Sequence, residues 1–381
     1  MSVPRTASSL DYTSDEYSIR WYDERDREAF LNLYNLAFSG CTPEWFAWKY
    51  EQLPYADFVP IIVAEKDGEI GGFRPVLPLP IQVGNETVMA LQLIDLMVHP
   101  DHRRQGLMTK MYEWMRDECW DDYAATFTYA NEPSRRGMMK MNDERWTHHD
   151  LGQFDKYERI HNFTAFTTDE HPPALQFGAK VANPVGTLKL RVQDMLKLTD
   201  NDIVVTRHDS VRTDILLEIH ERVHTDQPHV RRDAEFYNWR FAEPDTEFVM
   251  YSASRNGVRE AAIVVGFEQT SEGPMTANLT EILPLAGGFE LGAAFSCLLS
   301  RITSEFDFVD HISATGNVIP HRILAAHGFA RWNSYPLSKF IEPTSFLVCP
   351  LGGLDHSQPG IEAALVNPLG WNMSYCERLF G

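Results

Sequence analysis

Two stretches of this 381-residue chain share one aromatic pattern and are followed by the same order of elements. EWFAWKY (44–50) and EFYNWRF (235–241) each set two aromatic residues, a Trp, a basic residue and a last aromatic in the same register. After each come two strand patterns joined by Asp67-Gly68 or Asn256-Gly257, pairs that favour a tight hairpin turn. Repetition in matching order indicates duplication, and the alternative is two mixed α/β segments that share short motifs by chance.

The apolar periodicity predicts the elements of both halves. In the first half it predicts strands at 17–22, 58–65, 70–78, 87–98 and 123–130 and helices at 24–38, 44–50, 106–119 and 133–142. In the second half it predicts strands at 203–207, 248–254, 261–268, 275–285 and 307–315 and helices at 211–224, 289–303 and 318–327. This order predicts the α+β class, with two tandem domains, each a mixed, mostly antiparallel twisted sheet flanked by helices.

The length fits two domains. We expect a disordered N-terminus (1–16), a first domain (17–165), a linker (166–200), a second domain (201–340) and a proline-containing tail (341–381) that packs back onto the body. The N-terminus has no apolar segment of the kind found in secretory signals, and no stretch is long and apolar enough to span a membrane, so a cytoplasmic protein is expected.

The segment Val98 to Thr109 carries the chemistry. A strand pattern ends at Pro100, a short loop contains Arg103 and Arg104, and a helix begins at about Gly106. Glycine permits close approach of an anion, and successive backbone N–H groups with a helix N-terminus attract negative charge. Two guanidinium groups add to this attraction. The segment therefore predicts a pyrophosphate site, and the alternative is an arginine-rich surface loop.

Val98, Pro100, Arg103 and Gly106 match the signature V-x-P-x-x-R/Q-x-x-G-x-G/A, so the segment resembles the GNAT acetyltransferase superfamily. Met108 departs from it at the last small position. The R-R-x-G-x-L/M form and the duplicated fold resemble the enhanced-intracellular-survival (Eis) type. The resemblance implies acetyl-CoA as the acyl donor, without a metal. It implies that the donor contacts Met97, Val98, Arg103, Arg104, Gln105, Gly106, Leu107, Met108, Thr109 and Asn131.

The second half keeps only part of this pattern. Asn317 is followed by Gly328-Phe329 at the family spacing, which supports a second GNAT-like domain. The residues that match Arg103 and Gly106 are Gly287 and Glu290, and an acid there would repel a pyrophosphate. We therefore expect the second domain to bind no cofactor or to form part of the acceptor site.

Acetylation of an amine requires a proton acceptor for the amine, a donor for the oxyanion and an acid for the thiolate. Asp95, the one acid in the strand pattern 87–98, is the first candidate for a general base or amine anchor, and Glu132 is the second. The resemblance implies a Tyr as general acid at position 138, which here is Met. Tyr129, Tyr112 or a water could replace it.

The charge and the cysteine content limit which kinds of molecule this protein is expected to bind. The formal charge is −20, spread along the chain, which disfavours nucleic acid and anionic membranes. Such a surface would suit a halophilic source, for instance an archaeon, and the alternative is an ordinary acidic cytosolic protein. Five scattered cysteines without a CxxC pair favour buried free thiols over disulfides or a metal site.

Three functions remain open. The first is transfer of an acetyl group from acetyl-CoA to a primary amine of a small molecule or protein, by direct attack in a ternary complex. The second is a non-catalytic acyl-CoA-binding or regulatory module, which Met138 favours. The third is a FemX-like aminoacyl transferase, which pairs GNAT-like domains but lacks the pyrophosphate loop. Neither the acceptor nor the oligomeric state can be predicted from the sequence.

Overall fold

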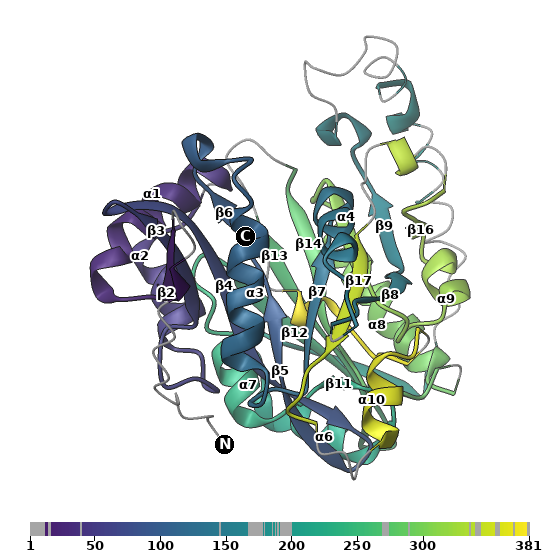
Figure 1. Cartoon of the computed structure of the whole chain (residues 1–381). Helices are drawn as coiled ribbons and strands as arrows, with labels where there is room; N and C mark the ends of the chain where they lie inside the picture. The colour runs from purple at the N-terminus through teal and green to yellow at the C-terminus, as the bar shows by residue number, and fades with distance from the viewer. Residues whose placement is uncertain are drawn as a thin grey trace.

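A computed structural model gives the fold, two twisted sheets covered by helices (Figure 1), and confirms the predicted α+β class. It describes residues 12–378 apart from 14–16, 39, 145, 167–177, 179, 185, 187, 189, 191–199, 269–273, 289, 335–336, 340–343, 355–358 and 369. Most of the predicted linker and nearly all of the predicted disordered N-terminus therefore lie outside the described residues.

The first sheet has ten strands among the described residues, in the order β1-β2-β3-β4-β5-β7-β17-β8, with β6 and β11 also paired to β4. Its strands are β1 (Tyr12–Thr13), β2 (Ser18–Trp21), β3 (Ile61–Lys66), β4 (Glu69–Val83), β5 (Glu86–Leu93), β6 (Met97–Val98), β7 (Ala125–Ala130), β8 (His149–Gln153), β11 (His229–Val230) and β17 (Ser345–Pro350).

The second sheet has seven strands in the described part of the chain, in the order β10-β12-β13-β14-β15-β9-β16. They are β9 (Lys156–Ile160), β10 (Ile203–His208), β12 (Glu247–Arg255), β13 (Val258–Glu268), β14 (Thr276–Leu283), β15 (His311–Thr315) and β16 (Ala330–Arg331). Each sheet contains a parallel pair, β5 with β7 and β14 with β15.

The helices pack on the faces of these sheets. They are α1 (Arg27–Ala37), α2 (Pro43–Phe46), α3 (Leu107–Cys119), α4 (Glu132–Lys140), α6 (Thr213–Arg222), α7 (Ala234–Arg240), α8 (Gly292–Glu305), α9 (His321–Ala326) and α10 (Pro359–Leu365). In the described residues, none of the helices has both the length and the apolar character needed to cross a membrane.

The two sheets exchange strands across the predicted domain limits. β9, within the predicted first domain, pairs with β15 in the second sheet. β17, in the predicted tail, lies between β7 and β8 of the first sheet, and Figure 1 shows this late strand beside early ones. Because each sheet needs a strand from the other part of the chain, the two units are interlocked. The exact limits of the domains stay a prediction.

The repeated aromatic motifs meet where the two units pack together. The Trp48 indole N–H donates to the Trp239 carbonyl at 2.7 Å, and the Trp239 indole N–H donates to the Trp48 carbonyl at 2.8 Å. The rings stack at 5.7 Å. Thr42 caps α2 and Asp233 caps α7 at equivalent positions. This reciprocal pairing of matching residues supports a duplication.

Candidate functional site

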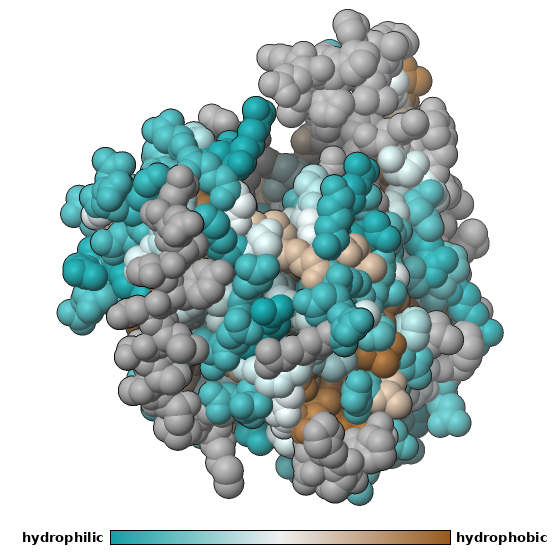
Figure 2. All heavy atoms as spheres, viewed as in Figure 1, coloured by the Kyte–Doolittle hydropathy of each residue, from teal (hydrophilic) through white to brown (hydrophobic). Residues whose placement is uncertain are grey.

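A cleft opens in the first sheet where two parallel strands separate. The pairing of β5 with β7 ends at Gln92 and Phe127, and beyond it the Thr128 hydroxyl donates to the Leu93 carbonyl at 2.8 Å. The cleft has a volume of about 430 Å³. It is lined by Phe38, Arg74, Leu93, Ile94, Asp95, Leu96, Met108, Thr128, Tyr129, Ala130, Asn131, Ser134, Met138, Thr344 and Arg378. On the face shown in Figure 2, apolar side chains form a strip between α3 and α4, the helices that carry Met108 and Met138.

The predicted single strand over 87–98 is interrupted beside this cleft. β5 ends at Leu93, β6 begins at Met97, and Asp95 between them has a left-handed φ of 44°. An aspartate tolerates this conformation better than most residues, and such backbone irregularities gather at functional sites. Asp95 lies in this break and lines the cleft.

The loop that precedes α3 has the geometry of an anion site. Arg104 (φ 65°) and Gly106 (φ 75°) are both left-handed, and residues 103–106 are exposed. Gly106 is the N-cap of α3, whose first N–H groups have no acceptor within the helix. The Arg103 Nε donates to the Val98 carbonyl at 3.2 Å, which holds that side chain beside the loop.

A small hydrogen-bonded group around Tyr17, the residue before β2, supports the loop. The Tyr17 hydroxyl donates to the Gln105 side-chain oxygen at 2.9 Å and lies 2.7 Å from Nδ1 of His102. Gln105 in turn donates to the Asp101 carbonyl at 3.2 Å. These contacts fix Gln105 as a support of the loop, with its backbone still exposed.

Other residues predicted to contact acetyl-CoA lie in β6 and at the start of α3. Met97 and Val98 pair with β4 on one edge. Leu107, the first residue of α3, has its side chain buried in the core, so only its backbone can contact the acyl donor. Met108 lines the cleft, and a Cβ at Gly137 of α4 would lie only 3.1 Å from the Met108 Cε. Gly137 therefore makes room for the bulky residue that departs from the family signature.

Asp95 belongs to a buried polar cluster. Lys49 Nζ lies 2.6 Å from Asp95 Oδ2, and the Tyr50 hydroxyl donates to the same oxygen at 2.7 Å. Lys49 also lies 4.4 Å from the Trp45 ring centroid, a cation–π contact. Lys49 comes from a π-helical turn, Ala47–Glu51, a feature frequent at functional sites. In the sequence this motif served as a sign of duplication, and the lysine was not singled out.

The remaining predicted residues lie at the end of β7. Tyr129 lines the cleft, and burial raises its phenol pKa well above its ordinary value, so it stays protonated at neutral pH. Asn131 also lines the cleft, and its side chain accepts a hydrogen bond from the Ser134 N–H at 3.0 Å as the cap of α4. Glu132 points to solvent and pairs with Arg136 at 2.7 Å, so the structure does not bring it into the cleft.

Met138, at the position of the expected general acid, and Tyr112, one of its possible replacements, lie in different places. Met138, which lines the cleft, has no proton to donate. Tyr112 is buried under the sheet, 3.3 Å from Nε2 of His148, and is not part of the cleft lining. Arg74 and Arg378 line the cleft and were not predicted. A lone arginine within the apolar run of β4 was the one signal in the sequence that could have marked Arg74.

The fold and this cleft define an α+β protein with an exposed loop and helix N-terminus beside two separated parallel strands. Residues 18–138 match the family model for the acetyltransferase (GNAT) domain. This part of the chain is therefore a GNAT domain, as predicted. A comparison with curated protein sequences finds no match.

Solved structures resemble the chain across both sheets. A GCN5-related N-acetyltransferase from Anabaena variabilis matches with a TM-score of 0.56 and 10% identity, over 87% of this chain and 72% of that one. N-myristoyltransferase from Saccharomyces cerevisiae, solved with myristoyl-CoA and inhibitors, gives 0.55 and 12%, over 89% and 80%. Eis1 from Mycobacterium abscessus gives 0.47 and 13%, over 87% and 72%. The first two show the fold alone. The two mixed sheets flanked by helices are consistent with a tandem GNAT-like fold.

Proposed function

We propose that this chain is an N-acyltransferase that moves an acetyl group from acetyl-CoA to a primary amine by direct attack in a ternary complex. The observation that supports it best is the exposed loop 103–106, which has left-handed residues at Arg104 and Gly106 and begins α3 beside the cleft. A diphosphate held there would place the rest of a long acyl-CoA at the separated strands.

In this proposal, acetyl-CoA is bound more by backbone groups than by side chains. The N–H groups at the start of α3 and the guanidinium groups of Arg103 and Arg104 bind the pyrophosphate. The pantetheine arm passes between β6 and β7, next to Met97 and Val98. The thioester then reaches the cleft, where holding the two reactants together contributes much of the rate.

The transfer forms a C–N bond and breaks the C–S bond. The amine attacks the thioester carbonyl, and Asp95 accepts the amine proton through Oδ1, the oxygen that Lys49 and Tyr50 leave open. Coenzyme A leaves as a thiolate and takes a proton from Tyr129 or a water. We expect Asp95→Asn to lower kcat by about 100- to 10,000-fold, the usual range for general catalysis.

Asp95→Asn would also leave the buried Lys49 without its counter-ion, so loss of folding must be separated from loss of chemistry. The double variant Lys49→Met/Asp95→Asn removes both charges of the pair. If both variants keep their melting temperature and donor affinity but lose turnover, the role of Asp95 as base is supported. Full turnover in either variant would contradict it.

The non-catalytic alternative has one observation in its favour, since Met138 in the cleft cannot protonate a thiolate. Calorimetry with acetyl-CoA and a thiol-release assay with polyamines, aminoglycosides and protein amines separate the two functions. Donor binding with thiol release supports the proposal, and binding without release from any amine supports the alternative. Arg103→Ala and Gly106→Glu should remove binding under both, while Glu290→Gln in the second domain serves as the matched control.

A further inference from the structure

Arg74 is a buried cation that borders the cleft. It lies in β4, opposite Ile62 of β3, and is 5% exposed. Its Cζ lies 5.4 Å from the Tyr112 ring centroid. Burial lowers the pKa of its guanidinium, with Tyr112 and Asp95 acting in the opposite direction. Within the described residues, its Nε and Nη2 atoms have no hydrogen-bond partner.

Those two atoms lie on the same edge of the guanidinium. Their N–H bonds point in nearly the same direction, which is the arrangement that binds both oxygens of one carboxylate. A buried charge without such a partner is costly, and an apolar residue of similar size would avoid the cost. Arg74 lines the cleft, and two of its guanidinium donors are buried without a partner among the described residues, which points to a ligand that supplies the acceptor oxygens.

The charges around the cleft agree with this. Of the described residues that line it, Arg74, Asp95 and Arg378 carry charge. The buried Lys49 pairs with the Asp95 carboxylate at 2.6 Å, so the lining has an excess of positive charge in a chain whose formal charge is −20. A site for a purely cationic amine would be expected to have the opposite sign.

We propose that the cleft binds a substrate carboxylate, held by the Nε and Nη2 edge of Arg74 with Arg378 as a second cation. This inference rests on the proposed acyl transfer and narrows its substrate class. The carboxylate belongs either to an α-amino acid or peptide acceptor or to a dicarboxylic acyl group such as succinyl, and the two sources are distinguished by the assay.

The test compares substrates that differ only in the carboxylate. One arm measures kcat/KM for glycine, alanine and phenylalanine against their amides with acetyl-CoA, with rates expressed per free amine. The other arm compares succinyl-CoA with acetyl-CoA as acyl donors to an amine that carries no carboxylate. We expect a preference for the carboxylate in one arm, and Arg74→Met should reduce that preference by roughly 10- to 100-fold, the effect of losing charged hydrogen bonds.

Two variants control for structure. Arg74→Lys keeps the charge but loses the two-pronged geometry, so it should give an intermediate preference. Arg116→Met removes another arginine that stacks on an aromatic ring, 5.3 Å from the Trp146 centroid and outside the cleft, and should leave the preference unchanged. Melting temperatures of all variants report folding.

The outcomes separate the inference from the proposed function. Acetyl transfer without preference in either arm, or an equal loss for acids and amides in Arg74→Met, overturns the carboxylate site and leaves the acyltransferase standing. If no thiol is released from any substrate, calorimetry with glycine and with succinate in the presence of acetyl-CoA still decides. Binding that Arg74→Met weakens supports the site, and absence of binding overturns it.

Discussion

The two sheets contain the same gap between parallel strands, but one gap is open and the other is filled. In the first sheet, β5 and β7 stop pairing at Gln92 and Phe127, and the cleft of about 430 Å³ follows. In the second sheet, β14 and β15 stop pairing at Leu279 and Ala314. Beyond that point, residues 372–377 of the tail lie against β14 and the end of β15.

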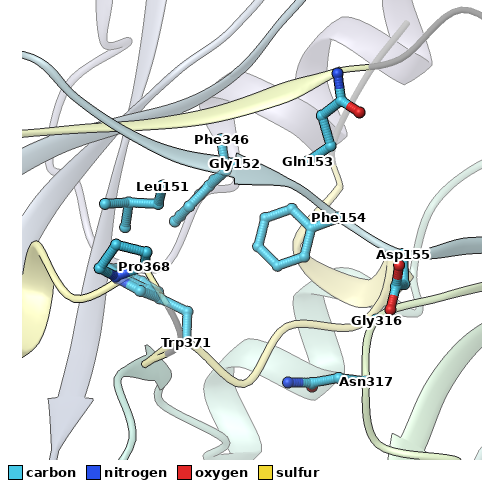
Figure 3. Close-up of a pocket in the computed structure, with 10 residues that line it drawn as sticks. All are labelled: Leu151, Gly152, Gln153, Phe154, Asp155, Gly316, Asn317, Phe346, Pro368 and Trp371. Atoms are coloured by element: carbon cyan, nitrogen blue, oxygen red, sulfur yellow. The ribbon is translucent and has the colours of Figure 1, made fainter.

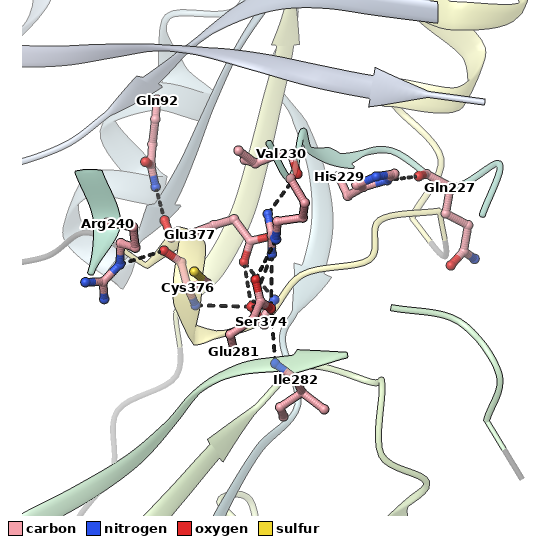
Figure 4. Close-up of polar contacts among 11 residues, drawn as sticks. Gln92, Gln227, His229, Val230, Arg240, Glu281, Ile282, Ser374, Cys376 and Glu377 are labelled. Carbon is pink, nitrogen blue, oxygen red and sulfur yellow. Dashed lines mark hydrogen bonds and ion pairs between the residues drawn. The ribbon is translucent and has the colours of Figure 1, made fainter. Parts of the chain in front are cut away.

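A buried ionic cluster holds the tail in the second gap (Figure 4). The Arg232 Nε donates to Glu281 of β14 at 2.6 Å, and the same guanidinium pairs with Glu377 of the tail. The Ser374 hydroxyl donates to Glu281 at 3.1 Å. At Gly316, which follows β15, a Cβ would lie 2.0 Å from the Met373 carbonyl oxygen, so only glycine lets the tail pass.

The same segment links the two gaps. The Gln92 side-chain amide of β5 donates to the Glu377 carbonyl at 2.7 Å, and the next residue, Arg378, lines the open cleft. Arg240, which matches Lys49 in the repeat, donates from Nε to the Cys376 carbonyl at 3.0 Å. In the first unit the basic residue of the motif pairs with the cleft acid, and in the second it holds the tail.

The loop after β6 in the first unit and the loop after β14 in the second also differ. In the second unit, Gly287 (φ 121°) and Gly288 (φ 38°) are left-handed, but no arginine takes the place of Arg103, and Glu290 stands where Gly106 does in the first. Asn317, the counterpart of Asn131, lines a separate pocket of about 190 Å³ with Phe154, Phe346 and Trp371 (Figure 3). The same strand geometry can therefore leave an open cleft or hold the tail. The loop after the first strand and the segment that fills the gap determine which of the two occurs.

The largest expected effect breaks the loop of the open unit. Gly106→Glu places a bulky acid at a left-handed φ of 75°, next to the helix N–H groups that we propose bind the pyrophosphate. We expect acetyl-CoA affinity to fall by more than about 100-fold, since strain and repulsion act together. Calorimetry measures it, and Glu290→Gln should change nothing. Equal effects in both loops would show that the two units are alike.

The second prediction concerns the filled gap. Arg232→Met leaves Glu281 and Glu377 buried together without their cation, and breaking such a cluster costs about 3–5 kcal/mol of unfolding free energy. Chemical denaturation measures it. Arg222→Met, which removes an exposed pair with Glu218 in α6, should cost less than about 1 kcal/mol. Similar losses in both variants would mean that the tail is not anchored by this cluster.

The third prediction tests the symmetry of the two units. Trp48→Phe and Trp239→Phe each remove one indole N–H and, with it, one buried hydrogen bond to a main-chain carbonyl of the matching tryptophan. We expect each to cost about 1–3 kcal/mol. The two losses should be nearly equal, and the double variant should cost less than their sum because the rings stack on each other. Strongly unequal losses would argue against an equivalent role in the repeat.

Local features were predictable from the sequence, and long-range ones were not. Asp67-Gly68 and Asn256-Gly257 form the predicted hairpin turns with left-handed φ values. The loop before α3 also follows from its residues, because a glycine at a helix start acts within a few residues. The insertion of β17 beside β7 depends on pairing across more than 200 positions, which no local pattern encodes.

In the candidate site, too, local features were predictable from the sequence and long-range contacts were not. Asp95 lines the cleft as its position predicts, but its partner Lys49 lies 46 residues away in a motif that resembles plain core. Glu132 follows the strand end as expected, yet it sits in the first turn of α4, where Arg136 one turn later draws it to the surface. Burial of Arg74 depends on α3 covering β4, a tertiary contact.

The smallest effect is a pH dependence that belongs to the filled gap alone. Burial, with the neighbouring Glu281, raises the pKa of Glu377, while Arg232 opposes the shift. Since the folded state then holds its proton more tightly than the unfolded state, this carboxyl contributes stability at low pH that is lost as the pH rises above its ordinary pKa. A single proton gives at most about 1.4 kcal/mol per pH unit. Denaturation of the wild type and Glu377→Gln between about pH 4 and 8 isolates this slope, and Glu362→Gln on the exposed side of α10 is the control. If Glu377→Gln leaves the pH profile unchanged, the two carboxyls share the Arg232 charge without a bound proton. The filled gap would then be held by ions alone.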